Sequence, residues 1–159
     1  MPHHDLDGLS ADDFQRIYAV NVVGPYHMCQ AVAPTMKAQG SGSIVNIASI
    51  AYAASKGALN TMTLSLARVL GPEIRINTVC PGFVQGRWQQ QWLGDAYDER
   101  IKQEEAATPL GRAGSAEDMA EVASMFLTSC HNGTGEVIQS DSGRYLGFAP
   151  PRRVERESY

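Results

Sequence analysis

Basic residues are scarce in this sequence, and their scarcity argues against one large class of function. The 159 residues include 13 Lys and Arg, of which only three are Lys, against 17 Asp and Glu, so the net charge is −4. A protein that binds nucleic acid needs a dense set of cations against the phosphates. We therefore expect no nucleic-acid partner.

Long apolar runs are also missing. No stretch approaches the roughly 18 to 20 residues that a helix needs to cross a bilayer. The first residues are polar and acidic and lack the apolar core of a secretory signal. We therefore expect no contact with a membrane. The adjacent His3 and His4 lie in this polar terminus, where such pairs are usually solvated, so we expect no metal site either.

Cysteine is too rare and too widely spaced for a disulfide framework. The sequence has three cysteines, Cys29, Cys80 and Cys130. An odd number of distant cysteines favours reduced thiols in a reducing compartment. We expect a cytoplasmic protein.

The residues that are present alternate between helical and strand patterns. We expect helices over 14–36, 52–70, 88–105 and 115–127, with a bend or restart in the first one at Pro25 and Pro34. Ser10 and Ser115 are each followed by an aspartate three residues later, which predicts a capping box at two helix starts. Short, β-branched runs predict strands over 44–47, 74–79 and 136–139. This alternation is typical of an α/β fold with an open parallel sheet. We expect one domain over 1–149, followed by a polar tail over 150–159.

Candidate chemistry lies where the first strand ends and the next helix begins. Tyr52 and Lys56 are four residues apart, so both project from one face of that helix. An ammonium about 4 Å from a phenol favours the phenolate by up to about 4 kcal/mol, which is nearly three pKa units. The phenol could then give and take a proton, while the Ser49 hydroxyl holds the same substrate oxygen.

Each of these residues also has a purely structural interpretation. A Tyr and a Lys at this spacing arise by chance, and a surface Tyr commonly packs under a Lys side chain. Asn21 could relieve a helix bend, and Asn46 and Asn77 are expected to tie strands to neighbouring backbone. The position of the pair after a strand that ends in Ser favours the functional interpretation.

Several blocks together resemble the short-chain dehydrogenase/reductase family. They are Val20-Asn-Val-Val-Gly24, Ile44-Val-Asn-Ile-Ala-Ser49, Tyr52-Ala-Ala-Ser-Lys56, Ile74-Arg-Ile-Asn-Thr-Val-Cys-Pro-Gly82, Pro109-Leu-Gly-Arg-Ala-Gly-Ser-Ala-Glu-Asp118 and Thr134-Gly-Glu-Val. They follow the family's order from about Ser10 to Gly143. The resemblance implies the second half of a three-layer, Rossmann-like fold.

The resemblance also implies roles for four catalytic residues. Tyr52 would be the acid/base, Lys56 would lower its pKa and bind the nicotinamide ribose, and Ser49 would orient the substrate oxygen. Asn21 would hold a water that links Lys56 to solvent. The cofactor would be NAD or NADP.

Further residues would contact the cofactor or cover the substrate. By the resemblance, Pro81, Gly82 and Val84 would lie along the nicotinamide, together with Tyr52 and Lys56. An aromatic cluster after the second strand is either core or a substrate lid: Phe83, Trp88, Trp92 and Tyr97. As a lid, it suggests a hydrophobic or ring-shaped alcohol.

Two features depart from the family pattern. No set of glycines fits the family's phosphate-binding motif, so the residue that separates NAD from NADP is expected outside this sequence. Ser49 and Tyr52 are three residues apart, where the family has roughly a dozen. We expect that a loop segment is missing between Ile50 and Ala51, with a chain gap there.

The sequence thus predicts an NAD(P)-dependent oxidoreductase that moves a hydride between nicotinamide and a secondary alcohol or ketone. The alternative is a catalytically inactive fragment that serves as an oligomerisation or binding module. In the family, the two long helices pack against a partner's copies, so we expect a homodimer or homotetramer. A nucleotide-sugar epimerase or dehydratase shares the Tyr and Lys, but too little chain follows Gly82 for its substrate domain.

Overall fold

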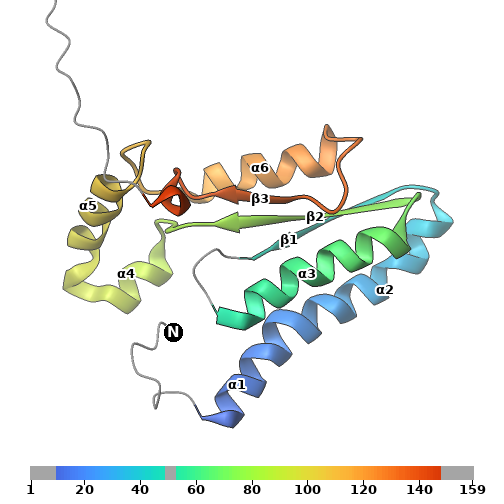
Figure 1. Cartoon of the computed structure of the whole chain (residues 1–159), viewed down its shortest axis with the longest axis horizontal. Helices are drawn as coiled ribbons and strands as arrows, with labels where there is room; N and C mark the ends of the chain where they lie inside the picture. The colour runs from blue at the N-terminus through green and yellow to red at the C-terminus, as the bar shows by residue number, and fades with distance from the viewer. Residues whose placement is uncertain (1–9, 49–52, 148–159) are drawn as a thin grey trace, which may run out of the picture.

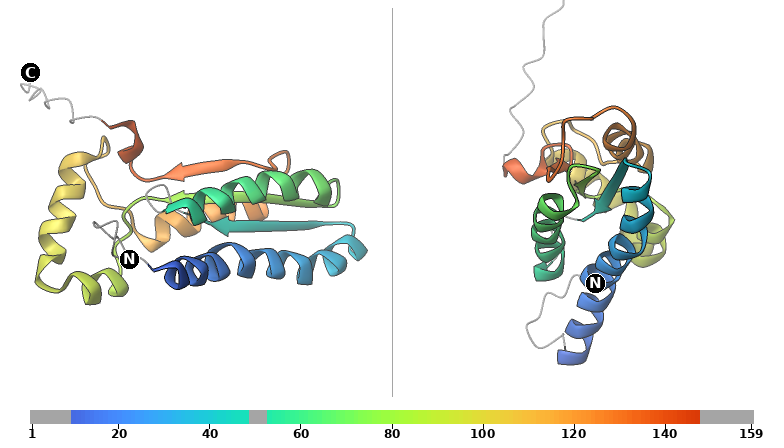
Figure 2. Two further views of the ribbon diagram at one scale, coloured as in Figure 1. Left: turned by 60° about the horizontal axis from the view of Figure 1, so that its bottom comes forward. Right: turned by 90° about the vertical axis from the view of Figure 1, so that its right-hand side faces the viewer.

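Three parallel strands form the centre of the computed structural model, which describes residues 10–48 and 53–147. They are β1 (Gly42–Ile47), β2 (Ile74–Pro81) and β3 (Val137–Ser140), in the order β1-β2-β3. Helices α2 and α3 cover one face of the sheet and α6 covers the other (Figures 1 and 2). This is the three-layer parallel arrangement that the alternation of helices and strands predicts.

The first long helix contains a change of helical pitch that the sequence did not locate. α1 (Ala11–Tyr18) begins at a capping box on Ser10 and continues through a π-helical turn, η2 (Ala19–Val23), into α2 (Gly24–Ala38). Pro25 lies in the first turn of α2, where a missing N–H costs nothing. A helical restart at Pro34 is wrong, because α2 continues through that residue. Pro34 is exposed, so the carbonyl it leaves without a donor can face solvent.

Helix α3 (Ala53–Leu70) is attached to the sheet by both apolar and polar contacts. Leu59 packs with Ala48 and Cys80 in one of the buried clusters. The Thr63 hydroxyl is fully buried; it accepts hydrogen bonds from Asn46 Nδ2 (2.9 Å) and Thr78 Oγ1 (2.8 Å) and donates to a carbonyl of its own helix. One side chain of α3 therefore bonds to β1 and β2 together.

The chain between β2 and β3 makes a helical excursion beyond the carboxyl end of the sheet (Figure 1). It contains α4 (Arg87–Leu93), a 3-10 turn η3 (Gly94–Ala96) and α5 (Tyr97–Ala107). The expected single helix over 88–105 is thus two helices. The break falls at Gly94, whose φ of 52° lies in the positive range that glycine adopts more readily than any other residue.

The last elements return the chain to the sheet. α6 (Ala116–Thr128) begins at the capping box that the sequence predicts on Ser115, and η4 (Arg144–Leu146) follows β3. Asn77 of β2 is fully buried; its Nδ2 donates to the Gly133 carbonyl and its Oδ1 accepts from the Glu136 N–H, both at 3.0 Å. The structural interpretation of Asn77 is confirmed. Within the described residues, no helix is both long and apolar enough to cross a bilayer.

Candidate active site

Lys56 is the charged group that the fold places at the carboxyl edge of the sheet. It lies in the first turn of α3, and its Nζ donates a hydrogen bond to the carbonyl of Ile47, the last residue of β1, at 3.2 Å. The side chain is half-buried. Burial lowers the pKa of Lys56 below its ordinary value, and the charge of the Cys80 sulfur acts in the opposite direction. The site therefore holds a partly desolvated cation.

Cys80 is the neighbour of this cation that sequence reasoning missed. It lies at the carboxyl end of β2, is 2% exposed, and donates a hydrogen bond from its Sγ to Asn60 Oδ1 at 3.5 Å. Burial raises the pKa of the thiol, while the Asn60 contact and the Lys56 charge lower it. The sequence places Asn60 one helical turn after Lys56, on the same face of its helix, but it carries no signal that Cys80 meets this face.

Asn21 approaches the same region from the π-helical turn. Its Nδ2 donates to the Oγ of Ser55 at 3.2 Å, and Ser55 is 1% exposed. The π-helical turn therefore brings Asn21 beside the residue that precedes Lys56. Isolated π-turns inside α-helices frequently occur at functional sites.

Two of the four predicted catalytic residues fall in a part of the chain that the structure does not describe. Tyr52 and Ser49 both lie outside the described residues, as does the expected missing segment between Ile50 and Ala51. Their proposed convergence with Lys56 therefore remains a sequence-based prediction.

The residues expected along the nicotinamide form a path that begins at Pro81, the last residue of β2, and continues beyond the strand. A Cβ added to Gly82 would lie 2.6 Å from the Cβ of Asp141, so only glycine fits this crossing of the two strand ends. Val84 forms an isolated parallel bridge to Gly114. Pro81, Gly82 and Val84 are half-buried, which leaves part of each accessible to a ligand.

The aromatic cluster splits into two parts. Trp88 and Trp92 stack on each other with ring centroids 5.9 Å apart, and they are 59% and 48% exposed. They are therefore not core residues, and their role as a substrate lid stays a sequence-based prediction. Phe83 is half-buried, with the guanidinium of Arg100 5.5 Å from its ring centroid. Tyr97, at the start of α5, is also half-buried.

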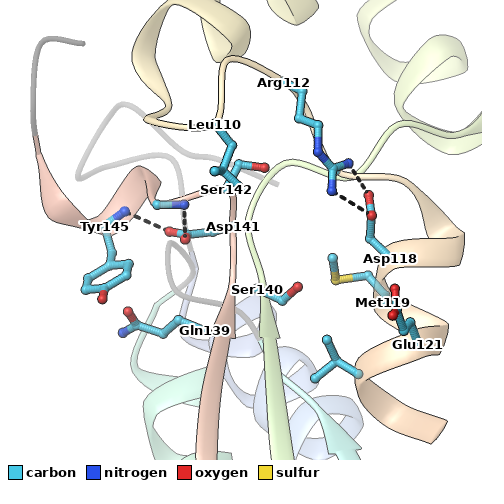
Figure 3. Close-up of a pocket in the computed structure, with 13 residues that line it drawn as sticks. Leu110, Arg112, Asp118, Met119, Glu121, Gln139, Ser140, Asp141, Ser142 and Tyr145 are labelled. Atoms are coloured by element: carbon cyan, nitrogen blue, oxygen red, sulfur yellow. Dashed lines mark hydrogen bonds and ion pairs between the residues drawn. The ribbon is translucent and has the colours of Figure 1, made fainter. Parts of the chain in front are cut away.

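A cavity of about 320 Å³ lies elsewhere, between the end of β3 and the start of α6 (Figure 3). It is lined by none of the predicted site residues.

Two carboxylates line this cavity. Asp118 pairs with Nη1 and Nη2 of Arg112 at 2.6 and 2.8 Å, and these contacts, with the Ser115 N–H, hold the pKa of Asp118 well below the usual range. Asp141 accepts the N–H groups of Gly143 and Tyr145. Because both oxygens of each carboxylate accept a hydrogen bond within the protein, we assign them to structure.

The described residues contain no group of three or more His, Cys, Asp or Glu side chains that could hold a metal ion.

Comparison with known proteins gives consistent matches. The family described as enoyl-(acyl carrier protein) reductase matches residues 2–144. Ketoacyl reductase 2 of the granaticin polyketide synthase from Streptomyces violaceoruber is 33% identical over 156 residues, which cover 92% of this chain. The 3alpha-hydroxysteroid dehydrogenase of Mediterraneibacter gnavus is 38% identical over 143 residues, which cover 82% of this chain.

A solved structure also resembles this fold. The 3-oxoacyl (acyl-carrier-protein) reductase of Agrobacterium tumefaciens, crystallised with NADP bound, superposes with a TM-score of 0.78 at 29% identity. The match covers 87% of this chain and 58% of that structure. The chain likewise spans 61% and 55% of the two sequence relatives.

Proposed function

Because this chain belongs to the short-chain dehydrogenase/reductase family, we propose that it acts in reversible hydride transfer between NAD or NADP and a secondary alcohol or ketone. The observation that carries the proposal is the half-buried Lys56 at the carboxyl edge of a parallel sheet, where ligands of such sheets bind. The names of the relatives, a ketoacyl reductase and a hydroxysteroid dehydrogenase, support the reaction class.

The residues at this edge fit the nicotinamide end of the cofactor. The Lys56 ammonium can donate to ribose hydroxyls, and Pro81 and Gly82 are only half-buried, so a flat ring can lie against their accessible side. The same chain holds no glycine-rich turn for the phosphates. When bound, the nicotinamide supplies or accepts the hydride.

The chain's own residues would handle the proton. Tyr52 gives its phenolic proton to the substrate oxygen in reduction and takes it back in oxidation. Lys56 lowers the pKa of that phenol through its charge. Ser49 donates a hydrogen bond to the same oxygen and stabilises the negative charge that develops there. Asn21 positions the first turn of α3 through Ser55.

Replacement of Tyr52 tests this assignment. Tyr52→Phe removes the transferable proton, so we expect turnover to fall by about 10²- to 10⁴-fold with the fold intact. The measurement is nicotinamide absorbance with NAD or NADP and a panel of secondary alcohols. The matched control is Tyr145→Phe on η4, which removes an exposed phenol and should leave turnover unchanged. If wild type turns over an alcohol and Tyr52→Phe turns it over at the same rate, the proposal is wrong.

A second candidate function is an oligomerisation module without activity. The outward side of α3 carries small, exposed residues, Ala54, Gly57 and Thr61, which permit close approach of another helix. We propose that this face supports a homodimer or homotetramer in either case. If neither NAD nor NADP raises the melting temperature and no alcohol is turned over, the module is favoured.

We also propose a cytoplasmic location. The described cysteines Cys29, Cys80 and Cys130 are all free thiols, which fits a reducing compartment.

A further inference from the structure

A buried carboxylate lies at the base of the helical excursion that carries the two tryptophans. Glu104 of α5 is 3% exposed, although it is a charged residue. Arg100, one turn earlier on the same helix, pairs with one carboxylate oxygen, and Arg144 Nη1 pairs with the other at 3.0 Å. A buried carboxylate is stable only when it is paired in this way. The pairing links α5 to η4, forty residues further along the chain.

Each arginine is in turn fixed to a strand end. Arg100 lies over the ring of Phe83, two residues beyond β2. Arg144 begins η4, whose turn is held by the Asp141 carboxylate through the N–H groups of Gly143 (3.0 Å) and Tyr145 (2.7 Å). The two arginines thus connect Glu104 to the carboxyl ends of β2 and β3, which border the proposed nicotinamide path.

The outer part of the excursion has few other attachments. α4 and α5 pack mainly on each other and on η3, and they extend away from the sheet (Figure 1). Trp88 and Trp92 lie on α4 with their stacked rings largely exposed. The orientation of this apolar surface therefore depends on how the base of α5 is held.

We propose that Glu104, clamped between Arg100 and Arg144, is a positioning residue that sets the orientation of α4 and α5 over the substrate site. This inference rests on the proposed function for its effect on substrate, but not for its effect on the helices. A loosened clamp leaves the Trp88 and Trp92 surface in many orientations, so substrate binding weakens while the proton-transfer residues stay in place.

The tryptophans provide a direct readout, because these two are the only ones in the sequence. The variants are Glu104→Gln and Arg144→Gln, with Arg144→Lys as the conservative rescue. The matched control is Glu105→Gln, which neutralises an exposed neighbour on the same helix. In the 159-residue chain we expect lower tryptophan anisotropy for both Gln variants, partial recovery for Arg144→Lys, and no change for Glu105→Gln.

A second readout uses trypsin and the exposed sites at Arg87 and Lys102. We expect cleavage there to accelerate at least about threefold in Glu104→Gln, relative to cleavage at the exposed Lys37 of α2. If the variants remain folded by circular dichroism and both readouts match wild type, the proposal is wrong. If both Gln variants lose their helices altogether, Glu104 serves the fold and not the lid, which also overturns it.

Kinetics separate this inference from the proposed function. With an alcohol that wild type turns over, we expect Glu104→Gln to raise KM by about tenfold and to change kcat by less than about twofold. A fall in kcat at constant KM would contradict a positioning role. If wild type turns over no alcohol, the proposed function fails, whereas anisotropy and proteolysis still decide the role of Glu104.

Discussion

At the scale of single residues, Lys56 links stability to function. Burial lowers its pKa, so the charged form of this lysine opposes folding at neutral pH. We expect Lys56→Met to abolish turnover and to raise the urea midpoint at pH 7. The unfavourable contribution is fully present below the folded pKa of Lys56, declines as pH rises from that pKa towards the ordinary value of 10.5, and is absent well above 10.5, where the lysine is neutral in both states. The gain in midpoint should therefore shrink as pH rises towards 10.

The control for this prediction is Lys37→Met, which removes an exposed lysine from α2. The urea midpoint of Lys37→Met should differ little from that of wild type, both at pH 7 and towards pH 10. If Lys56→Met is instead less stable than wild type at pH 7, the hydrogen bond from Lys56 to Ile47 outweighs the cost of burying the charge.

The hydrogen-bond partners of a side chain could be predicted where they are close neighbours in the sequence. The capping hydroxyls of Ser10 and Ser115 were predicted from a carboxylate three residues later, and both capping boxes are present. The contacts of Glu104 with Arg144 and of Cys80 with Asn60 could not be predicted in this way. Arg144 and Asn60 meet them only because separate elements pack together, and sequence spacing does not record such contacts.

At the scale of elements, the start of α6 depends on one hydroxyl. Ser115 Oγ accepts the Asp118 N–H at 3.1 Å and donates to its carboxylate at 2.9 Å. We expect Ser115→Ala to lower the free energy of unfolding by about 1 kcal/mol, measured in urea. Ser124→Ala, the same change at an exposed site within α6, should have no such cost because alanine favours helix interiors. Equal losses in the two variants would refute the capping assignment.

Element types were predicted better than their irregularities. The prolines predicted a bend or restart at Pro25 and Pro34, whereas the irregular turn is π-helical and precedes Pro25. That turn contains the contact between Asn21 and Ser55 of α3, so tertiary packing accompanies it. Similarly, Gly94 divides the predicted helix over 88–105, although an isolated glycine is often tolerated within a helix.

At the scale of the whole molecule, substitutions on the exposed side of α3 can test whether copies of the chain associate through this helix. A Cβ at Gly57 would contact nothing within 4 Å, so Gly57→Arg fits the isolated chain without strain. If this side forms an interface, Gly57→Arg should convert the assembly to monomers, measured by size-exclusion chromatography with light scattering. Gly57→Ala should stay assembled and gain up to about 1 kcal/mol of stability. Unchanged assembly of the Gly57→Arg variant would exclude this face as the interface.

The overall architecture could be predicted because periodicity is local and parallel sheets have few arrangements. Alternating helices and strands predicted the parallel sheet, and the pairing of β1 with β2 and of β2 with β3 confirms it. The course of α4 and α5 could not be predicted, since their composition is compatible with either a core helix or an exposed one. Their orientation depends on contacts with both strand ends.

The buried Thr63 hydroxyl, in the middle of α3, has a consequence for the geometry of the first turn of that helix. Because strands β1 and β2 both bond to it, α3 can neither slide along the sheet nor turn about its own axis without losing both bonds. Lys56 lies about two turns earlier on the same helix. The direction in which its side chain leaves the helix is therefore set by the hydrogen bonds of Thr63. Adding or removing one residue between them would swing the ammonium by about 100° and carry it off the carboxyl edge.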